Sequence, residues 1–549
     1  MTGPSSGARA VVLRRARIHD LSAGAPTPAT ALALRHGRIV AVGADAEVWA
    51  AAGSDAPSID LGGRVVLPGF TDAHVHWATF ALLRRQLALD ATLSLADVLR
   101  RVRAAAADRE PGRWLVGRGW DHSRWGRWPT AADLDSVAPH VPVALTRKDG
   151  HAIWVNSAAL AATGINGHTP DPAGGEIVRA GQTPTGVLKE NAVRLVHHAM
   201  PSPDPVERQA AMIDAWPDAW GRGLTGMHDM GGLAGGALFR DLSTLRDAGE
   251  LGLRFVWYLT ETDLDEAIAL GLRSGLGDAW LTVGGLKLFL DGTLGSQTAD
   301  MLAPYEGDPA NRGLATLEFD AYVLLLERAS AAGLSTAVHA IGDAANRKAL
   351  DGFARMQRGH PGPRPLRGRI EHAQLLAPED VGRFGALGVV ASMQPLHATS
   401  DRELADRLWG ERAAYSYAWR SLLVAGARLA FGSDAPIEAL DVFAGVHAAV
   451  TRRRAQDGPR GGWRVEQAVD VRTALQAYTA GPAWAAGLED QLGSLEVGKR
   501  ADLIVLDRDP LEIPPGELLD LAVRATMIDG VWVWQAPGIE LPGPRHDGP

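Results

Sequence analysis

Eight short, mostly apolar runs alternate with helix-like stretches through most of this chain, and this alternation constrains the fold more than any other feature. The runs are residues 64–70, 223–229, 253–260, 282–292, 334–343, 367–374, 387–395 and 427–436. Several are separated by segments with apolar residues at helical spacing, such as residues 95–110 and 321–333. Eight such units predict an α/β fold of the TIM (β/α)8 barrel type, whose active site lies at the carboxyl ends of the strands.

The two ends of the chain carry short strands broken by turns, between residues 8 and 60 and between residues 493 and 534. Neither set makes a stable sheet alone, so we expect both termini to form one small β-sandwich. The first and second barrel strands are about 140 residues apart, where a barrel unit averages about 30, which predicts an inserted lobe over the barrel mouth. The predicted boundaries are 1–64 and 485–549 for the sandwich, 65–87 for strand 1 and the start of the barrel, 88–205 for the lobe and 206–484 for the remaining barrel.

The composition excludes several classes of function. The net charge of −9 comes without basic clustering, which argues against a nucleic-acid partner. The chain has no cysteine, so disulfides, thiolate zinc sites and a cysteine nucleophile are excluded. No apolar stretch has the length of a signal peptide core or a membrane span, so we expect a cytoplasmic protein without a membrane partner.

The segment GFTDAHVH, residues 69–76, contains two histidines. The preceding RVVLPGF is predicted to be the barrel strand that leads into them. Successive side chains of a strand alternate between faces, so His74 and His76 project from the same face, with Asp72 in register behind them. Neutral histidine nitrogens suit zinc and related divalent metals. Because a His-x-His pair also occurs by chance on polar strand faces, the metal interpretation depends on further donors.

Further donor residues lie near the ends of the predicted barrel strands: Lys287, His339, His372 and Asp434. Lys287 has apolar neighbours, where burial of an unpaired ammonium is costly. The structural alternative is a lysine paired with Asp291, and for each single histidine it is a satisfied core residue. Together with the two histidines of strand one, these residues at the ends of strands four, five, six and eight favour one functional site at the barrel rim.

Eight motifs occur in a fixed order along the chain: LPGFTDAHVH, DGHAIWVNSAAL, GGLKLFLDGTLGSQTA, VHAIGDAAN, RIEHAQ, SMQPLHA, FGSDAPIE and GSLEVGKRADLIVLD. This pattern resembles the amidohydrolase superfamily, in the branch called amidohydrolase family 3, which includes N-substituted formamide deformylases. The resemblance covers nearly the whole chain. Its motifs are specific for the branch and much less specific for a substrate.

The resemblance implies a metal site built from six residues: His74, His76, Lys287, His339, His372 and Asp434. In related barrels the lysine of strand four is carbamylated and bridges two divalent metals, so Lys287 is expected to carry CO2 as a carbamate between two ions. Two nearby cations depress the pKa of the lysine ammonium and hold the carbamate. Because no thiolate is available, these donors favour zinc.

The implied reaction is metal-dependent hydrolysis of a carbon–nitrogen amide bond in a small molecule, of the N-substituted formamide or N-acyl amine type. A metal-activated water attacks the carbonyl carbon. Asp434 accepts the proton of this water and delivers it to the departing nitrogen, which cannot leave as an anion. His228 and His397 are weaker candidates for contacts to the substrate or to its oxyanion.

The lobe at residues 88–205 is rich in tryptophan, and two interpretations stay open. Either these side chains form the core of the lobe, or some of them line an apolar substrate cleft. The tryptophans are Trp114, Trp120, Trp125, Trp128 and Trp154. One motif of the lobe groups further candidates for substrate contacts: Asp149, His151, Trp154 and Asn156.

Two other functions remain open. The same site could hydrolyse an ester, a lactone, a cyclic amide or an amine on a heterocycle; a mononuclear deaminase is disfavoured because it does not need the lysine. In a different class, the chain could be a non-catalytic scaffold with an amidohydrolase-like fold. That interpretation predicts lost ligands, whereas all six are present. The sequence leaves open the substrate and whether the chain forms a homo-oligomer.

Overall fold

A computed structural model describes residues 9–542 except 23–28, 54, 91–93, 108, 110–111, 149, 233–235, 360–365 and 459–460. The chain divides into two compact units, of which the first comprises Met1–Phe80 with Met212–Pro549 and the second Ala81–Ala211. Among the described residues, no helix is both long enough and apolar enough to cross a membrane.

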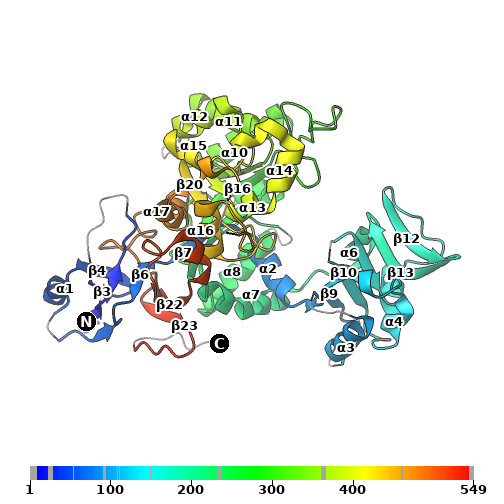
Figure 1. Ribbon diagram of the computed structural model, residues 1–549, viewed down its shortest axis with the longest axis horizontal. Helices are drawn as coiled ribbons and strands as arrows, with labels where there is room; N and C mark the ends of the chain where they lie inside the picture. The colour runs from blue at the N-terminus through cyan, green and yellow to red at the C-terminus, as the bar shows by residue number, and fades with distance from the viewer. Residues whose placement is uncertain are drawn as a thin grey trace. The chain divides into compact units, whose positions relative to one another are not determined.

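An eight-stranded parallel sheet forms the centre of the first unit (Figure 1). Its strands are, in order, β7 (Phe70–Val75), β14 (Leu224–Asp229), β15 (Arg254–Thr260), β16 (Leu281–Phe289), β17 (Ser335–Ala340), β18 (Arg369–His372), β19 (Val390–Met393) and β20 (Arg428–Phe431). Just beyond β20, the amide of Asp434 donates to the carbonyl oxygen of His74 at 2.7 Å, which brings the two outer strands together. The predicted eight-stranded parallel barrel is therefore confirmed.

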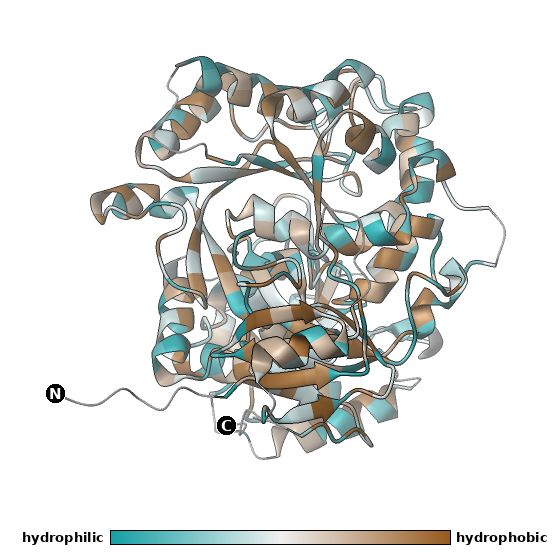
Figure 2. Cartoon of the chain, turned by 90° about the vertical axis from the view of Figure 1, so that its left-hand side faces the viewer, coloured by the Kyte–Doolittle hydropathy of each residue, from teal (hydrophilic) through white to brown (hydrophobic). Residues whose placement is uncertain are grey.

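Helices follow most of the barrel strands, and their sequences explain where they begin and end. Pro378 occupies the first turn of α12 (Pro378–Leu387), and the helix stops at Gly388, whose left-handed conformation suits glycine. α7 (Pro205–Trp220) begins in the second unit and ends in the first. The remaining helices of the first unit include α8 (Gly236–Ala248), α9 (Leu264–Ala269), α10 (Phe319–Ala331), α11 (Asp343–Gly359), α13 (Pro395–Ser400), α14 (Arg402–Trp409), α15 (Trp419–Val424), α16 (Val442–Thr451), α17 (Val471–Ala477) and α18 (Ala480–Ala485). Figure 2 shows hydrophobic residues along several strands and a mixture of hydrophobic and hydrophilic residues on the helices around them.

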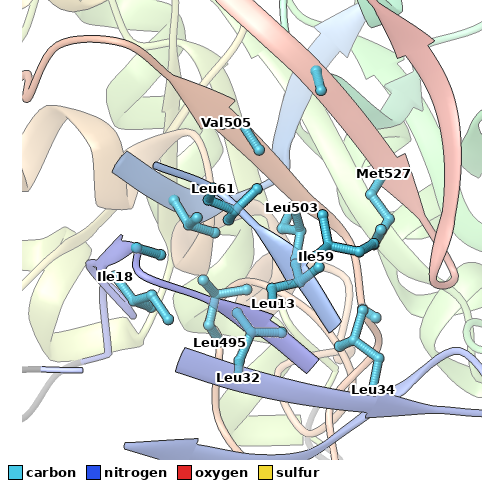
Figure 3. Close-up of a cluster of buried hydrophobic side chains, with 14 of the residues drawn as sticks. Leu13, Ile18, Leu32, Leu34, Ile59, Leu61, Leu495, Leu503, Val505 and Met527 are labelled. Atoms are coloured by element: carbon cyan, nitrogen blue, oxygen red, sulfur yellow. The ribbon is translucent and has the colours of Figure 1, made fainter. Parts of the chain in front are cut away.

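Two smaller sheets contain the strands near the chain ends. One has the order β4 (Arg38–Gly43), β3 (Ala31–Arg35), β1 (Val11–Arg14) and β5 (Ser58–Asp60), with α1 (Asp45–Ala52) beside it. The other has the order β2 (Arg17–Ile18), β6 (Val65–Pro68), β21 (Leu503–Leu506), β22 (Val523–Ile528) and β23 (Val531–Gln535). One buried cluster joins side chains from both sheets, including Leu13, Leu32, Leu503 and Met527 (Figure 3).

The prediction that RVVLPGF is the first barrel strand is wrong. Most of this run is β6, in which Val66 lies opposite Val505 in the sheet shared by both chain ends. The chain leaves that sheet at Pro68, which has no N–H, and at Gly69, where a Cβ atom would lie only 2.3 Å from the side chain of Thr225. The barrel strand β7 therefore starts at Phe70, after the proline and glycine that interrupt the run.

The second unit contains a six-stranded sheet in the order β12 (Gly175–Ala180), β13 (Thr183–Glu190), β11 (Ala152–Val155), β10 (Val143–Arg147), β9 (Leu115–Trp120) and β8 (Leu87–Ala88). Its helices include α3 (Leu95–Ala106), α4 (Ala131–Asp135), α5 (Ser157–Thr163) and α6 (Val193–Ala199), and α2 (Trp77–Arg84) begins in the first unit. Trp120 and Trp154 are fully buried in its core, whereas Trp128 is 39% exposed. Core packing thus explains at least two of the tryptophans, and the expected position of this unit over the barrel mouth stays a prediction.

Candidate metal centre

A cavity of about 370 Å³ lies among residues at the carboxyl ends of the barrel strands. All six predicted ligands line it: His74, His76, Lys287, His339, His372 and Asp434. They come from β7, β16, β17, β18 and the segment after β20, so residues separated by up to 360 positions meet in one place. The barrel rim therefore gathers the donors that the sequence placed at separate strand ends.

His74, in β7, and His76, just after this strand, are both held through Nδ1 of their rings. Nδ1 of His74 is 2.6 Å from Oε2 of Glu371, and Nδ1 of His76 is 2.7 Å from the carbonyl oxygen of Gly231. Both acceptors require a proton on Nδ1, which leaves the lone pair on Nε2. The Nε2 atoms of His74 and His76 lie 3.5 Å and 3.3 Å from Oδ1 of Asp434. Lone pairs and a carboxylate oxygen thus face one another, as expected around a cation.

In His339 and His372, too, one ring nitrogen is bonded to an oxygen atom of the protein. Nε2 of His339 is 3.0 Å from the carbonyl oxygen of Gly292, and Nδ1 of His372 is 2.8 Å from Oε1 of Gln394. The imidazole rings of His339 and His372 have centroids 4.5 Å apart. One nitrogen of each ring is therefore held by a protein acceptor, and the other is left as a donor of its lone pair.

Burial sets the charge of these imidazoles. It lowers the pKa of His74 to about 4 and the pKa of His339 to about 3, and it moves the pKa of His372 in the same direction. These three histidines are consequently neutral near pH 7, which is the form that binds a metal, whereas the hydrogen bond and charge of Asp434 outweigh burial and raise the pKa of His76. The candidate ligand atoms of His74, His372 and Asp434 all lie within 4.8 Å of one another.

Lys287 is buried in β16, and its Nζ atom has no hydrogen-bond partner among the described residues. Burial lowers the pKa of this amine to about 8. The alternative pairing with Asp291 is wrong, because the carboxylate of Asp291 instead accepts hydrogen bonds from the backbone amides of Asp300, Ile341 and Gly342. A buried amine without a partner is costly unless another group completes its environment.

The backbone conformation at two donors is also unusual. His372 has a φ of 73° and Asp434 a φ of 59°, both in the left-handed region that non-glycine residues seldom adopt. Each such residue costs about 1–3 kcal/mol and persists only where its surroundings impose it. At Asp434, the hydrogen bond from its backbone amide to the carbonyl oxygen of His74 holds the backbone in this conformation. Strain at the strand ends therefore accompanies the convergence of the donors.

This donor set fits divalent metal ions. It offers neutral imidazoles, one carboxylate and one buried amine, with no thiolate, which is chemistry suited to zinc. Oδ1 of Asp434, like Nζ of Lys287, is buried without a hydrogen-bond partner in the described structure. A cation beside the imidazole lone pairs would satisfy that carboxylate oxygen.

His397 also reaches the cavity. Its Nε2 donates to Oδ2 of Asp434 at 3.1 Å, and its Nδ1 lies 3.9 Å from Oε1 of Glu438. Burial alone would lower the pKa of His397, but the bonds to Asp434 and Glu438 prevail and raise it to about 10. His397 is therefore placed to orient the second oxygen of Asp434.

The other predicted substrate contacts lie elsewhere. The Asn156 amide is buried and bonds to four backbone groups of the second unit, and Trp154 lies in the core of that unit. Packing accounts for both side chains, and their contacts to a substrate stay predictions. His151 is exposed in the second unit beside Glu190 and stays a prediction. His228 is buried, with Nδ1 at 2.8 Å from Arg369, and does not line the described cavity. Asp149 lies outside the described residues.

Sequence reasoning missed Glu371, Arg369 and Gln394, which hold two of the histidines. The signal available for the first two was a pair of opposite charges in RIEH, a run otherwise expected to be buried. Two charged residues at positions i and i+2 of a buried strand share one face and need partners there. That pattern could have indicated a polar network inside the barrel.

Comparisons with known proteins agree with this architecture. The sequence model of the amidohydrolase family matches residues 58–534. Protein LONG AFTER FAR-RED 3 of Arabidopsis thaliana is 35% identical over 492 residues, covering 87% of this chain and 84% of that protein. N-substituted formamide deformylase of Arthrobacter pascens is 32% identical over 529 residues, covering 93% of this chain and 96% of that protein. The crystal structure of an uncharacterized metal-dependent hydrolase from Pyrococcus furiosus matches with a TM-score of 0.78 at 30% identity, covering 92% of this chain and 100% of the other.

Proposed function

Because this chain belongs to the amidohydrolase family, we propose that it hydrolyses the carbon–nitrogen bond of an N-substituted formamide or N-acyl amine in a metal-dependent reaction. The observation that carries the proposal is the arrangement of the buried histidines around Asp434. Each of the four imidazoles has one nitrogen held by a protein acceptor, and in two of them, His74 and His76, the other nitrogen faces Oδ1 of Asp434. Such a preformed donor set supports hydrolysis and gives no reason for a non-catalytic scaffold.

The residues divide the chemical work among them. Divalent ions bound by this donor set polarise a carbonyl group and lower the pKa of a water molecule. Asp434 takes up the proton of the attacking water and passes it to the leaving nitrogen, which departs as a neutral amine. The hydrogen bond from His397 to Oδ2 keeps the carboxylate of Asp434 in one orientation during both transfers.

Lys287 enters this proposal as a carbamate. Its amine, with a pKa lowered to about 8, is neutral near pH 7 in a far larger fraction than an exposed lysine. The neutral amine adds CO2 and releases one proton, so a buried cation without a partner becomes an anion with two oxygen donors. That anion completes a donor set for two divalent ions, which the four histidines and one carboxylate do not fill by themselves.

The substrate class follows from the relative and from the cavity wall. The name of the Arthrobacter protein specifies N-substituted formamides. The lining of the cavity includes Phe289, Leu294, Ile341 and Ile437, which suit an apolar or aromatic amine substituent. Among the described lining residues there is no arginine, and the protonated ring of His397 is already bonded to Asp434. Because Lys287 faces the histidines, a substrate carboxylate would find no unpaired cationic side chain elsewhere in the described lining. A neutral secondary amide with an aromatic group fits best.

The proposal is tested by assaying zinc-loaded and metal-stripped protein on a matched set of compounds. N-Benzylformamide, N-benzylacetamide, benzyl formate and N-formylphenylalanine separate the amide from the ester and the neutral from the anionic substrate. We expect zinc-dependent release of benzylamine, lost in His74→Ala and kept in a control change of the exposed His198 to Ala. Hydrolysis of the ester without any amide would support the alternative reaction, and no hydrolysis of any compound would contradict the proposed function.

A further inference from the structure

A buried ion pair lies inside the barrel beneath the proposed metal centre. Arg369 and Glu371 both belong to β18 and are completely inaccessible to solvent. The Nε atom of Arg369 donates to Oε1 of Glu371, and its Nη2 donates to Oε2 at 3.0 Å. Burying two charges costs several kcal/mol each, and apolar side chains of similar size often serve stability equally well. The pair therefore needs an explanation beyond packing.

The other hydrogen bonds of this pair reach three further barrel strands. Ser392 of β19 donates to Oε2 of Glu371 at 2.6 Å and accepts from Nη2 of Arg369 at 2.5 Å. Arg369 also donates to the carbonyl oxygen of Ala73 in β7 at 2.6 Å and lies 2.8 Å from Nδ1 of His228 in β14. We call Arg369, Glu371, Ser392 and His228 the floor network. It fixes the position of the Glu371 carboxylate from four strands.

The carboxylate of Glu371 has one more partner, Nδ1 of His74, at 2.6 Å. This contact distinguishes His74 from the three other histidines of the site. His76, His339 and His372 are held by neutral acceptors, namely two backbone carbonyl oxygens and the amide oxygen of Gln394. Among these four rings, only His74 has a carboxylate as the hydrogen-bond acceptor of this nitrogen, since Oδ1 of Asp291 lies 3.6 Å from Nε2 of His339, beyond hydrogen-bond distance. A carboxylate acceptor draws the Nδ1 proton more strongly than an amide oxygen and makes the opposite nitrogen more basic.

We propose that the ion pair of Arg369 and Glu371 is a positioning device for His74. It holds the imidazole in the Nδ1–H tautomer with Nε2 turned towards Asp434, and it strengthens Nε2 as a metal donor. Arg369 and Glu371 are positioning residues, since neither lines the cavity. The inference rests on the proposed function, because it takes His74 as a metal ligand.

The first experiment reads the tautomer directly in the folded, metal-free wild-type protein. Long-range proton–nitrogen correlation spectra of protein labelled with 15N at histidine separate the Nδ1–H from the Nε2–H form. The resonance of His74 is assigned by its loss in His74→Gln. We expect the Nδ1–H form. An Nε2–H tautomer, or exchange between the two forms, would overturn the proposal.

The second experiment compares two buried ion pairs of the same unit. Arg369→Gln combined with Glu371→Gln removes both charges together and leaves no unpaired buried ion. The control is Arg254→Gln combined with Asp502→Asn, which removes the buried pair at the amino-terminal end of β15, where Arg254 and Asp502 are bonded at 2.6 Å. The zinc affinity of each metal-free protein is measured by competition with a chelator, and its melting temperature by circular dichroism.

We expect the change beneath His74 to weaken zinc binding by about 10- to 100-fold and the control change to leave it nearly unaltered, although both lower the melting temperature. Equal losses of affinity in both variants, or no loss in either, would overturn the proposal. If the variants do not fold, the tautomer in the wild-type protein decides. Wild-type protein that binds no zinc would contradict the proposed function, while the spectrum of His74 would still decide on the ion pair.

Discussion

The floor network and the cavity directly beside it are built on the same barrel strands, but they differ in how their polar groups are satisfied. In the floor network, the charges of Arg369 and Glu371 neutralise each other, and Ser392 bonds to both. In the cavity, Nζ of Lys287 and Oδ1 of Asp434 have no hydrogen-bond partner among the described residues, although Nζ lies 4.8 Å from the ring centroid of Phe289. Both regions are buried, so burial alone does not explain the difference.

The contrast separates groups that serve folding from groups that serve ligands. A buried polar atom without a partner costs about 1–3 kcal/mol, so it is retained where something outside the protein completes it. The floor network can reach its final geometry when the chain folds. We expect the cavity to reach its final geometry only when the proposed metal ions and substrate bind. Substitutions in the two regions are therefore expected to change different measured quantities.

The largest effect is expected at Lys287. Lys287→Ala removes the proposed carbamate bridge, so two cations would repel each other across an empty position. Purified wild-type protein should contain about two equivalents of divalent metal, and Lys287→Ala about one or fewer, with activity lost in parallel. Elemental analysis and the N-benzylformamide assay measure both. Lys499→Ala, far from the cavity in the terminal region, is the control.

Small acids test the chemical nature of the lysine group. Acetate or propionate could occupy the space left in Lys287→Ala and bridge the metals with a carboxylate. We expect partial recovery of metal content and activity with these acids and none with methylamine or ethylamine. Recovery with an amine, or full activity without any additive, would show that Lys287 works as an ammonium or has a structural role, and the contrast between the two regions would then lose its main example.

The next effect in size concerns Asp434. Asp434→Asn keeps the shape of the side chain and part of its affinity for metal, but an amide cannot take up the proton of the attacking water. Turnover should fall by roughly 10² to 10⁴ at saturating zinc. The comparison is made at equal metal content, measured on the same samples. Turnover near that of the wild type in metal-loaded Asp434→Asn would remove this residue from the proton transfers.

These predictions draw on residues that the sequence already indicated, and there is a physical reason for that success. Each donor follows an apolar run, and parallel strands bring their carboxyl ends to one rim, so a list of strand ends is also a list of neighbours. The floor network could not be found in this way. Glu371 contacts His74 across 297 positions of sequence, inside the barrel, and the contact depends on how the strands tilt and close.

One further error has a local cause. RVVLPGF reads as one strand because its apolar residues continue on both sides of Pro68 and Gly69, although this pair marks the change from one sheet to another. Asn156 has the polar character expected of a substrate contact, but its side chain oxygen caps α5. A buried asparagine that satisfies backbone groups and one that binds a ligand look alike in sequence.

Stability measurements sharpen the comparison further, because the two regions should respond with opposite sign. Ser392→Ala leaves groups of the floor network with one bond fewer and should lower the free energy of unfolding of metal-free protein by about 1–3 kcal/mol. Lys287→Met removes a buried amine without a partner and should raise the same quantity by about 1–2 kcal/mol. Urea unfolding of metal-free protein in CO2-free buffer measures both. Destabilisation by Lys287→Met would mean that the amine has a folding role.

The pH dependence gives an independent control for that result. The pKa of Lys287 falls from 10.5 to about 8 on folding, because burial disfavours the ammonium. Between these values the unfolded chain binds more protons than the folded one, so stability should rise with pH from about 8 to about 10.5. This increment should be missing in Lys287→Met. An identical pH profile in both proteins would show that the amine is as well solvated as in the unfolded chain.

The smallest effect is expected at the outer cavity wall, where the contrast between the two regions becomes weakest. Glu438 lines the cavity with its side chain 23% exposed, and its nearest cationic group is Nδ1 of His397 at 3.9 Å. A carboxylate that is partly in water should favour a cationic substituent on the substrate by about 1 kcal/mol, or about fivefold in kcat/KM. We therefore expect kcat/KM for N-[4-(aminomethyl)benzyl]formamide to fall about fivefold relative to kcat/KM for N-benzylformamide in Glu438→Gln.

Using the ratio of two substrates in one variant cancels any change transmitted through His397 to Asp434, since both substrates depend on it equally. The exposed Glu379→Gln, on α12, should leave the ratio unchanged. A ratio that is also unchanged in Glu438→Gln would mean that this carboxylate orients His397 and does not contact the substrate, which would assign it to the group of residues that serve the fold.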